Sequence, residues 1–268
     1  MDSRELRYFV AVAEELNFGR AATRLGIAQP PLSRTIQRLE RRMGVTLLAR
    51  TSRSVTLTDA GEVLLHEGRK ALTALTAAER RAQRAGSEHL VLATKPNTDA
   101  GLLEKILAKY GMEVDLHICG IGEQSVMLRE GRADAALLRF PYDDSEGFAY
   151  EELLTEGSVV VLPRTHRLAG RRAATMADLA GEQLPHWPGS PANGGPLVQD
   201  SAQLLQLVAL GRTVAVMPAS TAQYLHSDLT CVPLTDGPTT TLAIAWPEDA
   251  RSRALAALVE AAAACAAG

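Results

Sequence analysis

Residues Arg20 to Arg53 read RAATRLGIAQPPLSRTIQRLERRMGVTLLARTSR, and this stretch decides the fold of the N-terminal part of the chain. It holds eight arginines and a single acid, Glu40, although the whole 268-residue chain has a formal net charge of -3. One face of a small domain is therefore strongly cationic, which favours a polyanionic partner. We expect that partner to be duplex DNA.

The charge of the chain is divided unevenly along its length. Residues 1–86 carry 15 basic and 9 acidic side chains, whereas residues 87–268 carry 13 and 22. This asymmetry indicates a nucleic-acid-binding N-terminal part and a different role for the remainder. The length and the hydrophobic content of 46% are sufficient for two or three domains with buried cores.

Cysteine usage and hydropathy indicate the compartment. The three cysteines are Cys119, Cys231 and Cys265, an odd number without C-x-x-C spacing, so neither a disulfide framework nor a zinc site is indicated. The N-terminus lacks a charged-then-apolar leader, and no apolar run approaches the roughly 18 residues of a membrane helix. We therefore expect a soluble cytoplasmic protein without a metal or another cofactor.

Two helices and a tight turn are predicted before the arginine-rich helix. Apolar residues at helical spacing predict a first helix over residues 4–16. Asn17 can cap a second helix, which Gly26 then ends. The third helix begins at Gln29-Pro30-Pro31, where proline suits a first turn, although Ala28 provides no side-chain cap. The stripe of this helix that packs on the core is Leu32, Ile36, Leu39 and Met43.

The remaining face of the third helix is free to contact DNA. Gln29 and Ser33 lie near the end that can enter a major groove, and Gln can pair with adenine. Arg34 can read guanine or hold a phosphate, and Gln37 and Arg38 continue the face. Pro30 is expected to be structural, with a thymine methyl within its reach. An isolated basic helix is more often only solvated, but eight arginines beside a β-ribbon favour DNA binding.

A β-ribbon and a long helix follow the third helix. Gly44 ends that helix, and residues 46–51 and 54–58 form two extended segments whose tip carries Arg50 and Arg53, which we expect to neutralise phosphates. Thr58-Asp59 caps a helix to about residue 84, roughly 40 Å long. Its apolar stripe needs a second chain to cover it, which predicts a dimer. The stripe consists of Val63, Leu64, Ala71, Leu72 and Leu75.

The run AATRLGIAQPPLSRTIQRLERRMGVTLLARTSRSVTLTDAGE resembles the winged helix-turn-helix of LysR-type transcriptional regulators in residue order, spacing and wing. The resemblance implies three parts: a DNA-binding domain (1–58), a dimerisation helix (59–86) and an effector-binding domain similar to the periplasmic binding proteins (89–268). It implies a ligand-responsive regulator that binds inverted half-sites of double-stranded DNA as a homodimer or a dimer of dimers. RNA polymerase is a further candidate partner.

The C-terminal part alternates strands with helices, which predicts a parallel α/β sheet. The expected strands cover 89–93, 113–118 and 133–138, with helices at 99–110 and 123–130. Residues 153–154 and 158–162 are expected to begin another sheet, followed by helices at 176–180 and 201–210, strands at 214–218, 229–234 and 240–246, and a closing helix at 252–267. Similarity to the family's two lobes places lobe I at about 89–140 and 248–268, and lobe II at about 141–247, shortened at 185–198.

An effector site is expected where the two lobes meet. The loop from Lys95 to Thr98 leads into a helix N-terminus, which favours an anion. The resemblance places this loop, the turn at Gly122 and Glu123, and the strand exit Arg139-Phe140 around the cleft. The full set of candidates is Lys95, Asn97, Thr98, Gly122, Glu123, Arg139, Phe140 and Trp187.

These candidates have different expected roles. Lys95 and Arg139 would hold a carboxylate, and Phe140 and Trp187 would form apolar walls. Glu123 would instead favour a cationic or hydrogen-bonding group. The alternative is that Thr98 is only a helix cap and Arg139 only a surface charge.

Two other functions are alternatives to an effector-responsive regulator. The chain has no G-x-S-x-G elbow, P-loop, H-E-x-x-H or G-x-G-x-x-G after a strand, so we expect no enzyme and no catalytic residues. Its six histidines are scattered without metal-ligand spacing. The second alternative is a DNA-binding regulator whose C-terminal domain serves only oligomerisation or partner contact, without a small ligand, and the shortened second lobe leaves it open.

Overall fold

The structure is a computed structural model that describes residues 1–51, 54–84, 89–187, 190–191 and 193–266. The chain divides into two compact units, Met1–Gln83 and Arg84–Gly268, and each is described by itself. None of the helices in the described residues is long and apolar enough to cross a membrane.

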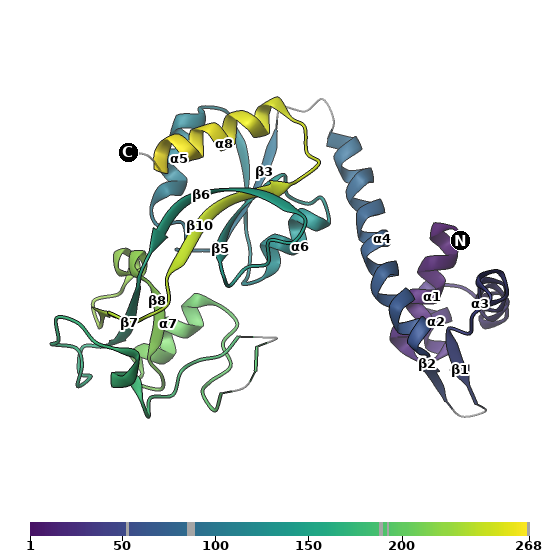
Figure 1. Ribbon diagram of the computed structural model, residues 1–268, viewed down its shortest axis with the longest axis horizontal. Coiled ribbons are helices and arrows are strands. Elements are labelled where there is room, and N and C mark those ends of the chain that lie inside the picture. Colours follow the sequence, from purple (N-terminus) through teal and green to yellow (C-terminus); the bar gives the residue numbers. More distant parts are fainter. Residues whose placement is uncertain (52–53, 85–88, 188–189, 192, 267–268) are drawn as a thin grey trace. The chain divides into compact units, whose positions relative to one another are not determined.

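Local capping signals set the helix boundaries of the first unit (Figure 1). The Asp2 side chain caps α1 (Ser3–Glu15), and the Asn17 side chain caps α2 (Phe18–Leu25) by accepting from the Arg20 backbone N–H. Gly26 and Gly44, with φ of 67° and 72°, end α2 and α3 (Gln29–Met43) in a conformation that glycine adopts without steric cost. The predicted helix-turn-helix is confirmed.

The core of the first unit buries most of the predicted stripe of α3. Leu32, Ile36 and Leu39 are each 0% exposed and pack among the apolar residues of α1 and α2. Met43, predicted on the same stripe, is 42% exposed. It lies in the last turn of the helix, where Gly44 turns the chain away, so the prediction for Met43 is wrong.

The ribbon and the long helix are both present. Strands β1 (Leu48–Arg50) and β2 (Val55–Leu57) pair antiparallel, and α4 extends over Asp59–Arg84. The apolar residues of α4 divide between two environments. Leu64 and Leu72 pack against the core of their own unit, whereas Val63 and Leu75 remain 64% and 38% exposed. Only part of the predicted stripe is therefore left for a second chain.

The larger sheet of the second unit has the strand order β4-β3-β5-β10-β6. Its strands are β3 (Leu90–Thr94), β4 (Val114–Ile118), β5 (Ala135–Phe140), β6 (Phe148–Glu156) and β10 (Thr240–Pro247). β3 pairs parallel with β4 and β5, but β10 is antiparallel to both of its neighbours. The prediction of a parallel sheet is correct for three strands and wrong for the other two.

Two strands belong to a different lobe from the one that the sequence suggested. The predicted lobe II, 141–247, contains β6 and β10, yet both hydrogen-bond within the five-stranded sheet of lobe I. The lobe boundaries at 140 and 247 therefore need correction. Residues 153–154 lie in β6, whose sequence mixes apolar and polar residues. Such a pattern predicts a strand, but it does not show which other strand that strand pairs with.

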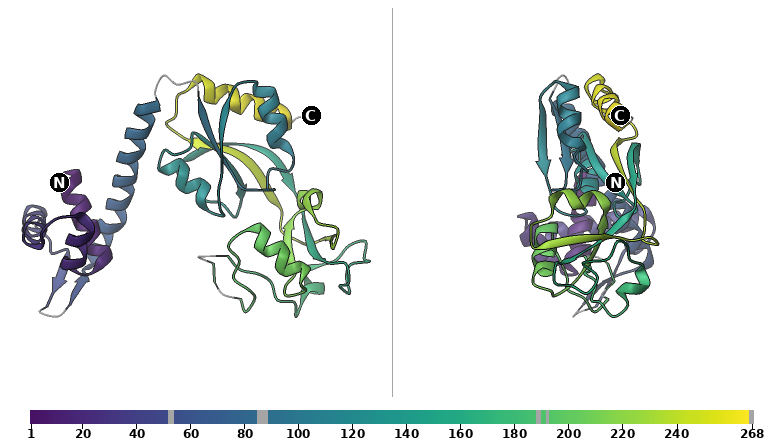
Figure 2. Two further views of the ribbon diagram at one scale, coloured as in Figure 1. Left: turned by 180° about the vertical axis from the view of Figure 1, so that it is seen from behind. Right: turned by 90° about the vertical axis from the view of Figure 1, so that its left-hand side faces the viewer.

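Helices cover both faces of the larger sheet (Figures 1 and 2). α5 (Leu102–Tyr110) and α8 (Arg253–Ala266) lie side by side on one face and bury Leu137 and Ile244. α6 (Glu123–Arg129) lies on the other face over Ala136 and Leu138. These two apolar layers make lobe I a helix-sheet-helix sandwich.

The smaller sheet has the order β8-β7-β9 and forms the centre of lobe II. Its elements are β7 (Ser158–Pro163), the 3-10 helix η1 (Met176–Leu179), α7 (Ser201–Ala209), β8 (Ala215–Pro218), the 3-10 helix η2 (Ala219–Tyr224) and β9 (Leu229–Pro233). In the shortened segment, the described residues make one isolated parallel bridge between His186 and Leu197. The two lobes thus differ in size, and lobe II is the less regular.

Candidate nucleic-acid interface and effector site

The outer face of α3 is exposed where the sequence places its DNA-reading residues. The side of the helix opposite Leu32, Ile36 and Leu39 is directed away from the core. The predicted contacts on this face are Gln29, Pro30, Arg34, Gln37 and Arg38, all exposed, and Ser33, which is half-buried. Their spacing along one helix brings them together on one surface.

The arginines of the opening stretch fall into two groups. Arg20, Arg24, Arg42 and Arg50 form ion pairs with Glu15, Glu14, Glu5 and Glu40 at 3.1, 2.7, 2.6 and 2.8 Å. Arg34, Arg38 and Arg41 are exposed on α3 and have no carboxylate partner among the described residues. Among the described arginines of this stretch, the three without a carboxylate partner all lie on α3, whereas the four paired arginines form ion pairs within the first unit.

One of the two predicted wing arginines, Arg50, differs from the prediction. Arg50, expected at the tip as a phosphate contact, instead bonds to Glu40, and its guanidinium lies 4.7 Å from the centre of the Phe18 ring. Its side chain is only 25% exposed, because it lies against Phe18 and Glu40. Arg53 lies outside the described residues. The wing arginine that the structure describes therefore makes contacts within the domain.

Two ion-paired acids of this unit have lowered pKa values. Hydrogen bonds from the Arg42 side chain and the Asp2 backbone hold the pKa of Glu5 at about 2. Burial would raise the pKa of Glu14, but hydrogen bonds from Arg69 and Arg24 outweigh it and lower that pKa. Both acids therefore stay ionised at neutral pH, and they join α1 to α2, α3 and α4.

Lys95, predicted to hold a carboxylate of the effector, is already paired with one inside the protein. Its Nζ lies 2.6 Å from Asp143 Oδ2, and the two side chains are 8% and 2% exposed. The same Asp143 oxygen accepts the backbone N–H of Arg139 at 2.7 Å. This buried pair fixes the loop after β3 to the turn after β5, so its charge is neutralised locally.

The Arg139 side chain bonds within lobe I and reaches Ser220 of lobe II. Its Nη1 donates to Glu156 Oε1 at 2.7 Å and to Thr240 Oγ1 at 3.1 Å. Its Nη2 donates to the Thr98 carbonyl at 2.8 Å and to Ser220 Oγ at 3.5 Å. The side chain is 4% exposed, and its Nε has no partner among the described residues. Arg139 is therefore not a surface charge.

The other predicted contacts are only partly brought together. Thr98 Oγ1 donates to the Lys95 carbonyl and does not cap α5, which begins after Gly101. Asn97, with φ of 56°, is exposed in the same loop. Gly122 precedes α6, and Glu123 accepts the Gly120 N–H at 2.8 Å. Trp187 packs against the core of lobe II around α7, so the structure gives it a role within that lobe.

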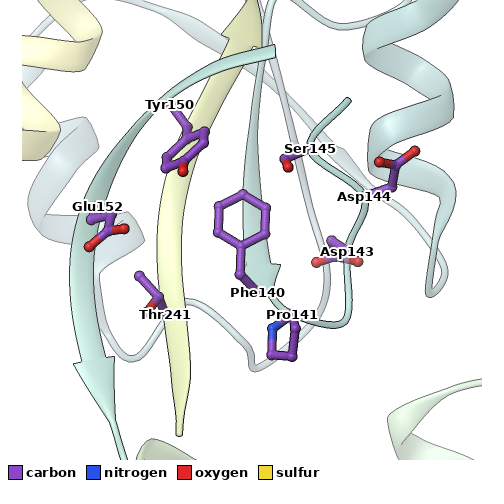
Figure 3. A pocket seen from close by; sticks show the side chains of 8 residues that line it. All are labelled: Phe140, Pro141, Asp143, Asp144, Ser145, Tyr150, Glu152 and Thr241. Atoms are coloured by element: carbon purple, nitrogen blue, oxygen red, sulfur yellow. The ribbon is translucent and has the colours of Figure 1, made fainter. Parts of the chain in front are cut away.

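Phe140 lines a cavity to which the Arg139 side chain does not contribute. Successive residues of a strand point to opposite faces of the sheet, so these neighbours in β5 are separated. A cavity of about 470 Å³ lies beside the Phe140 and Tyr150 rings, whose centres are 4.9 Å apart (Figure 3). Its lining also includes Pro141, Asp143, Asp144, Ser145, Glu152 and Thr241, and no basic residue. This lining does not suit a carboxylate.

Sequence reasoning missed the residues that complete the Arg139 cluster. Glu156 comes from β6, and its carboxylate also accepts the backbone N–H and the hydroxyl of Ser220 at 2.5 and 2.8 Å. A second polar contact joins the lobes where Tyr224 Oη donates to Asp99 Oδ1 at 3.3 Å. None of these residues stands in a motif, so only the folded chain identifies them.

Comparison with known proteins decides the family. Residues 3–62 match the description "Bacterial regulatory helix-turn-helix protein, lysR family", and residues 83–266 match "LysR substrate binding domain". The chain belongs to the LysR family. It is a DNA-binding transcriptional regulator with an effector-binding C-terminal domain, which confirms the resemblance inferred from the winged helix.

Full-length relatives and solved structures agree with this assignment. The Hca operon transcriptional activator HcaR of Escherichia coli strain K12 is 34% identical over 281 residues, covering 95% of each chain. BenM of Acinetobacter baylyi is 31% identical over 88% of this chain and 86% of BenM. The crystal structure of full-length CbnR with its target DNA has a TM-score of 0.56 and 25% identity, covering 99% of this chain and 100% of CbnR.

Proposed function

We propose that this LysR-family regulator reads DNA with the exposed face of α3 and responds to a small carboxylate-containing effector bound between its two lobes. The observation that carries the first part is the distribution of ion pairs. Arg34, Arg38 and Arg41 have no carboxylate partner among the described residues, whereas the neighbouring Arg20, Arg24 and Arg42 do. Unpaired arginines on a helix that can enter a groove favour contact with phosphates and base edges.

The residues of α3 have distinct roles in this proposal. Gln29, Ser33 and Arg34 lie in the first turns and read base edges in the major groove, with Pro30 shaping the turn. Gln37 and Arg38 continue the contact toward the phosphate backbone. Arg34 Nε is 3.4 Å from the Pro30 carbonyl, a long contact that leaves the guanidinium free to turn toward a base. Arg53 of the wing neutralises a phosphate.

The operator is proposed to be an inverted repeat bound by a homodimer or a dimer of dimers. Val63, Ala71 and Leu75 remain exposed on α4, and an apolar helix face of this kind is stabilised when a second copy covers it. A twofold dimer presents two α3 helices to two half-sites related by the same symmetry. RNA polymerase is proposed as a further partner, the cytoplasm as the compartment, and regulation without catalysis as the activity.

The effector proposal is supported by the cluster around Arg139. The buried guanidinium has an Nε–H without an acceptor among the described residues, so a ligand carboxylate oxygen can complete its hydrogen bonds. Thr98 and Ser220 contribute from either side of it. Lys95 supports the site through Asp143 rather than contributing free charge. A match to a substrate-binding domain favours this proposal over a purely oligomeric role.

Base reading by Arg34 is tested on duplexes that the full-length protein selects from a random library. Arg34→Ala should weaken binding to the selected duplex by about 1–3 kcal/mol and relax the preference at one base position of a single-substitution panel. The matched control is Arg20→Ala, which removes an equal charge that is already paired with Glu15. An equal loss across the whole panel for Arg34→Ala would refute base reading.

The effector proposal is tested by thermal unfolding of the full-length protein with a panel of small aliphatic and aromatic acids. A ligand that binds only the folded state raises the unfolding temperature with its concentration. Stabilisation by an acid, and its loss with the matching neutral amide, is the expected result. No stabilisation by any acid at millimolar concentration would contradict the proposal and support the oligomerisation-only alternative.

A further inference from the structure

The single acid of the opening stretch, Glu40, bonds to three groups beyond its own helix, all of them on strand β1 or on the residue before it. Its Oε1 accepts the backbone N–H groups of Leu47 and Leu48 at 2.9 and 3.1 Å. Its Oε2 accepts Arg50 Nη2 at 2.8 Å. One carboxylate near the C-terminal end of α3 thus holds the start and the end of strand β1.

The arginine on the other side of this contact is held in turn by the second helix. The Arg50 guanidinium lies 4.7 Å from the centre of the Phe18 ring, and Phe18 is the first residue of α2, 9% exposed. A cation over an aromatic face is attracted by the ring. Glu40, Arg50 and Phe18 therefore connect α3, the ribbon and α2 through a chain of half-buried and buried contacts.

We propose that Glu40 is a positioning residue for DNA binding, which fixes the wing relative to α3 through Arg50 and the backbone of β1. The proposal rests on the proposed role of α3 and the wing at the DNA. In this arrangement Arg50 is the partner of Glu40 and does not itself contact a phosphate. Other groups of the wing contact the phosphates, and they can do so only when the ribbon is held in place. A carboxylate is required because it accepts three hydrogen bonds, one of them from a cation.

For the change in DNA affinity when Glu40 is neutralised, this proposal predicts the opposite direction from simple electrostatics. Removing an acid from a DNA-binding face makes that face more positive, which by itself strengthens attraction to phosphates and steepens the salt dependence of binding. If Glu40 only adds unfavourable charge near DNA, or only occupies Arg50, its neutralisation should therefore tighten binding. If Glu40 positions the wing, its neutralisation should weaken binding.

The test compares full-length Glu40→Gln with the wild type on a duplex that the wild type selects from a random library. Glu40→Gln should bind about tenfold more weakly, with a shallower salt dependence, because the wing loses phosphate contacts. Hydroxyl-radical footprinting should show lost protection on the wing side and retained protection over the bases contacted by α3. The matched control is Glu62→Gln, which removes an exposed acid from the first turn of α4 and should bind as tightly as the wild type or slightly more tightly.

A double-mutant cycle with Arg50→Met separates joint action from independent contacts. If Glu40 and Arg50 act as one unit, the double variant should bind no more weakly than the weaker single variant. The proposal would be overturned if the double variant lost DNA affinity by the product of the two single-variant factors. It would also be overturned if Glu40→Gln bound DNA as tightly as the wild type. Should Glu40→Gln unfold at the assay temperature, Arg50→Met decides alone: lost protection across the wing side supports the proposal, and loss at one phosphate only overturns it.

The outcome is independent of base reading by α3. Failure of that role appears as wild-type behaviour, or as a uniform loss, of Arg34→Ala on the base-substitution panel. The Glu40 proposal fails if Glu40→Gln does not weaken DNA binding, or if the affinity losses of Glu40→Gln and Arg50→Met multiply in the double variant. Each proposal can therefore fail while the other stands.

Discussion

The contact between α4 and the wing leaves no room for a side chain at Gly61, which makes Gly61→Ala a sharp test of the packing in the first unit. A methyl group on Gly61 would lie 2.1 Å from the Leu47 carbonyl oxygen and 2.9 Å from Leu57 Cδ2. Relief requires a backbone shift of roughly 1 Å, because the nearest atom belongs to the main chain. The Leu47 oxygen also accepts the backbone N–H and the hydroxyl of Thr58, each at 3.1 Å.

Three contributions set the expected change in the free energy of unfolding for Gly61→Ala. Overpacking costs about 1–3 kcal/mol. The two hydrogen bonds from Thr58 are weakened, at about 1 kcal/mol each when lost. Gly61 lies in the first turn of α4, so alanine gains less there than the roughly 1 kcal/mol that it gains over glycine in a helix interior. We therefore expect Gly61→Ala to lower the free energy of unfolding of this unit by about 2–3 kcal/mol, a large part of the 5–15 kcal/mol typical of a domain.

Gly68, two turns further along α4, is the matched control. A methyl group there would lie 2.8 Å from Leu6 Cδ1, the end of a side chain that can rotate away. The small repacking cost and the gain in helix propensity should nearly cancel, so Gly68→Ala should change the free energy of unfolding by less than about 1 kcal/mol. The two variants make the same chemical change in the same helix.

The assay is urea unfolding of the full-length protein with two probes. Both tryptophans, Trp187 and Trp246, lie in the second unit, so their fluorescence reports that unit alone. Circular dichroism reports the helices of both units. Gly61→Ala should move an early transition in circular dichroism and leave the fluorescence transition in place. Equal free energies of unfolding for Gly61→Ala and Gly68→Ala would contradict the predicted clash with the Leu47 carbonyl.

Two further outcomes are expected in solution. Because Arg42 and the Asp2 backbone hold the pKa of Glu5 at about 2, below its usual 4.5, its contribution to stability is full above pH 4.5 and is lost as pH falls toward 2. Urea titrations at several pH values should therefore find Glu5→Gln less stable than the wild type by about 1 kcal/mol at pH 7 and equally stable near pH 2, and a gap independent of pH would contradict this. Burial raises the pKa of the Cys119 thiol to about 11, so iodoacetamide at pH 8 should label the half-buried Cys231 and Cys265 before Cys119, as mass mapping can show. Rapid labelling of Cys119 in the folded protein would contradict that burial.

The first unit could be predicted from the sequence because its signals are local. Asn17, Gly26 and Gly44 each mark a helix end through contacts within a few residues, and the apolar spacing of α3 marks its buried side. Sequence could not show which arginines are neutralised, because ion pairing depends on which helices pack together. Arg42 and Glu5, for example, are 37 residues apart.

The second unit was predictable in its elements but not in their pairing. Most strands and helices lie within a few residues of their expected positions, although β6 begins earlier, at Phe148, and the 3-10 helix η2 had no expected counterpart. β6 and β10 nevertheless pair in the sheet of lobe I. Hydrophobic patterns report burial and not the identity of the neighbouring strand. Phe140 and Arg139 are adjacent in sequence and were expected in one site, but strand geometry directs them to opposite faces.

A cationic winged helix-turn-helix can be predicted from the sequence, because charge, caps and helical periodicity are properties of neighbouring residues. Which charges of the two units are paired depends on the tertiary structure. It pairs Lys95 with Asp143, Arg139 with Glu156 and Arg50 with Glu40, over separations of 48, 17 and 10 residues. The reason is physical: a buried charge is stable only beside a partner, and the partner is chosen by the fold rather than by the neighbouring sequence.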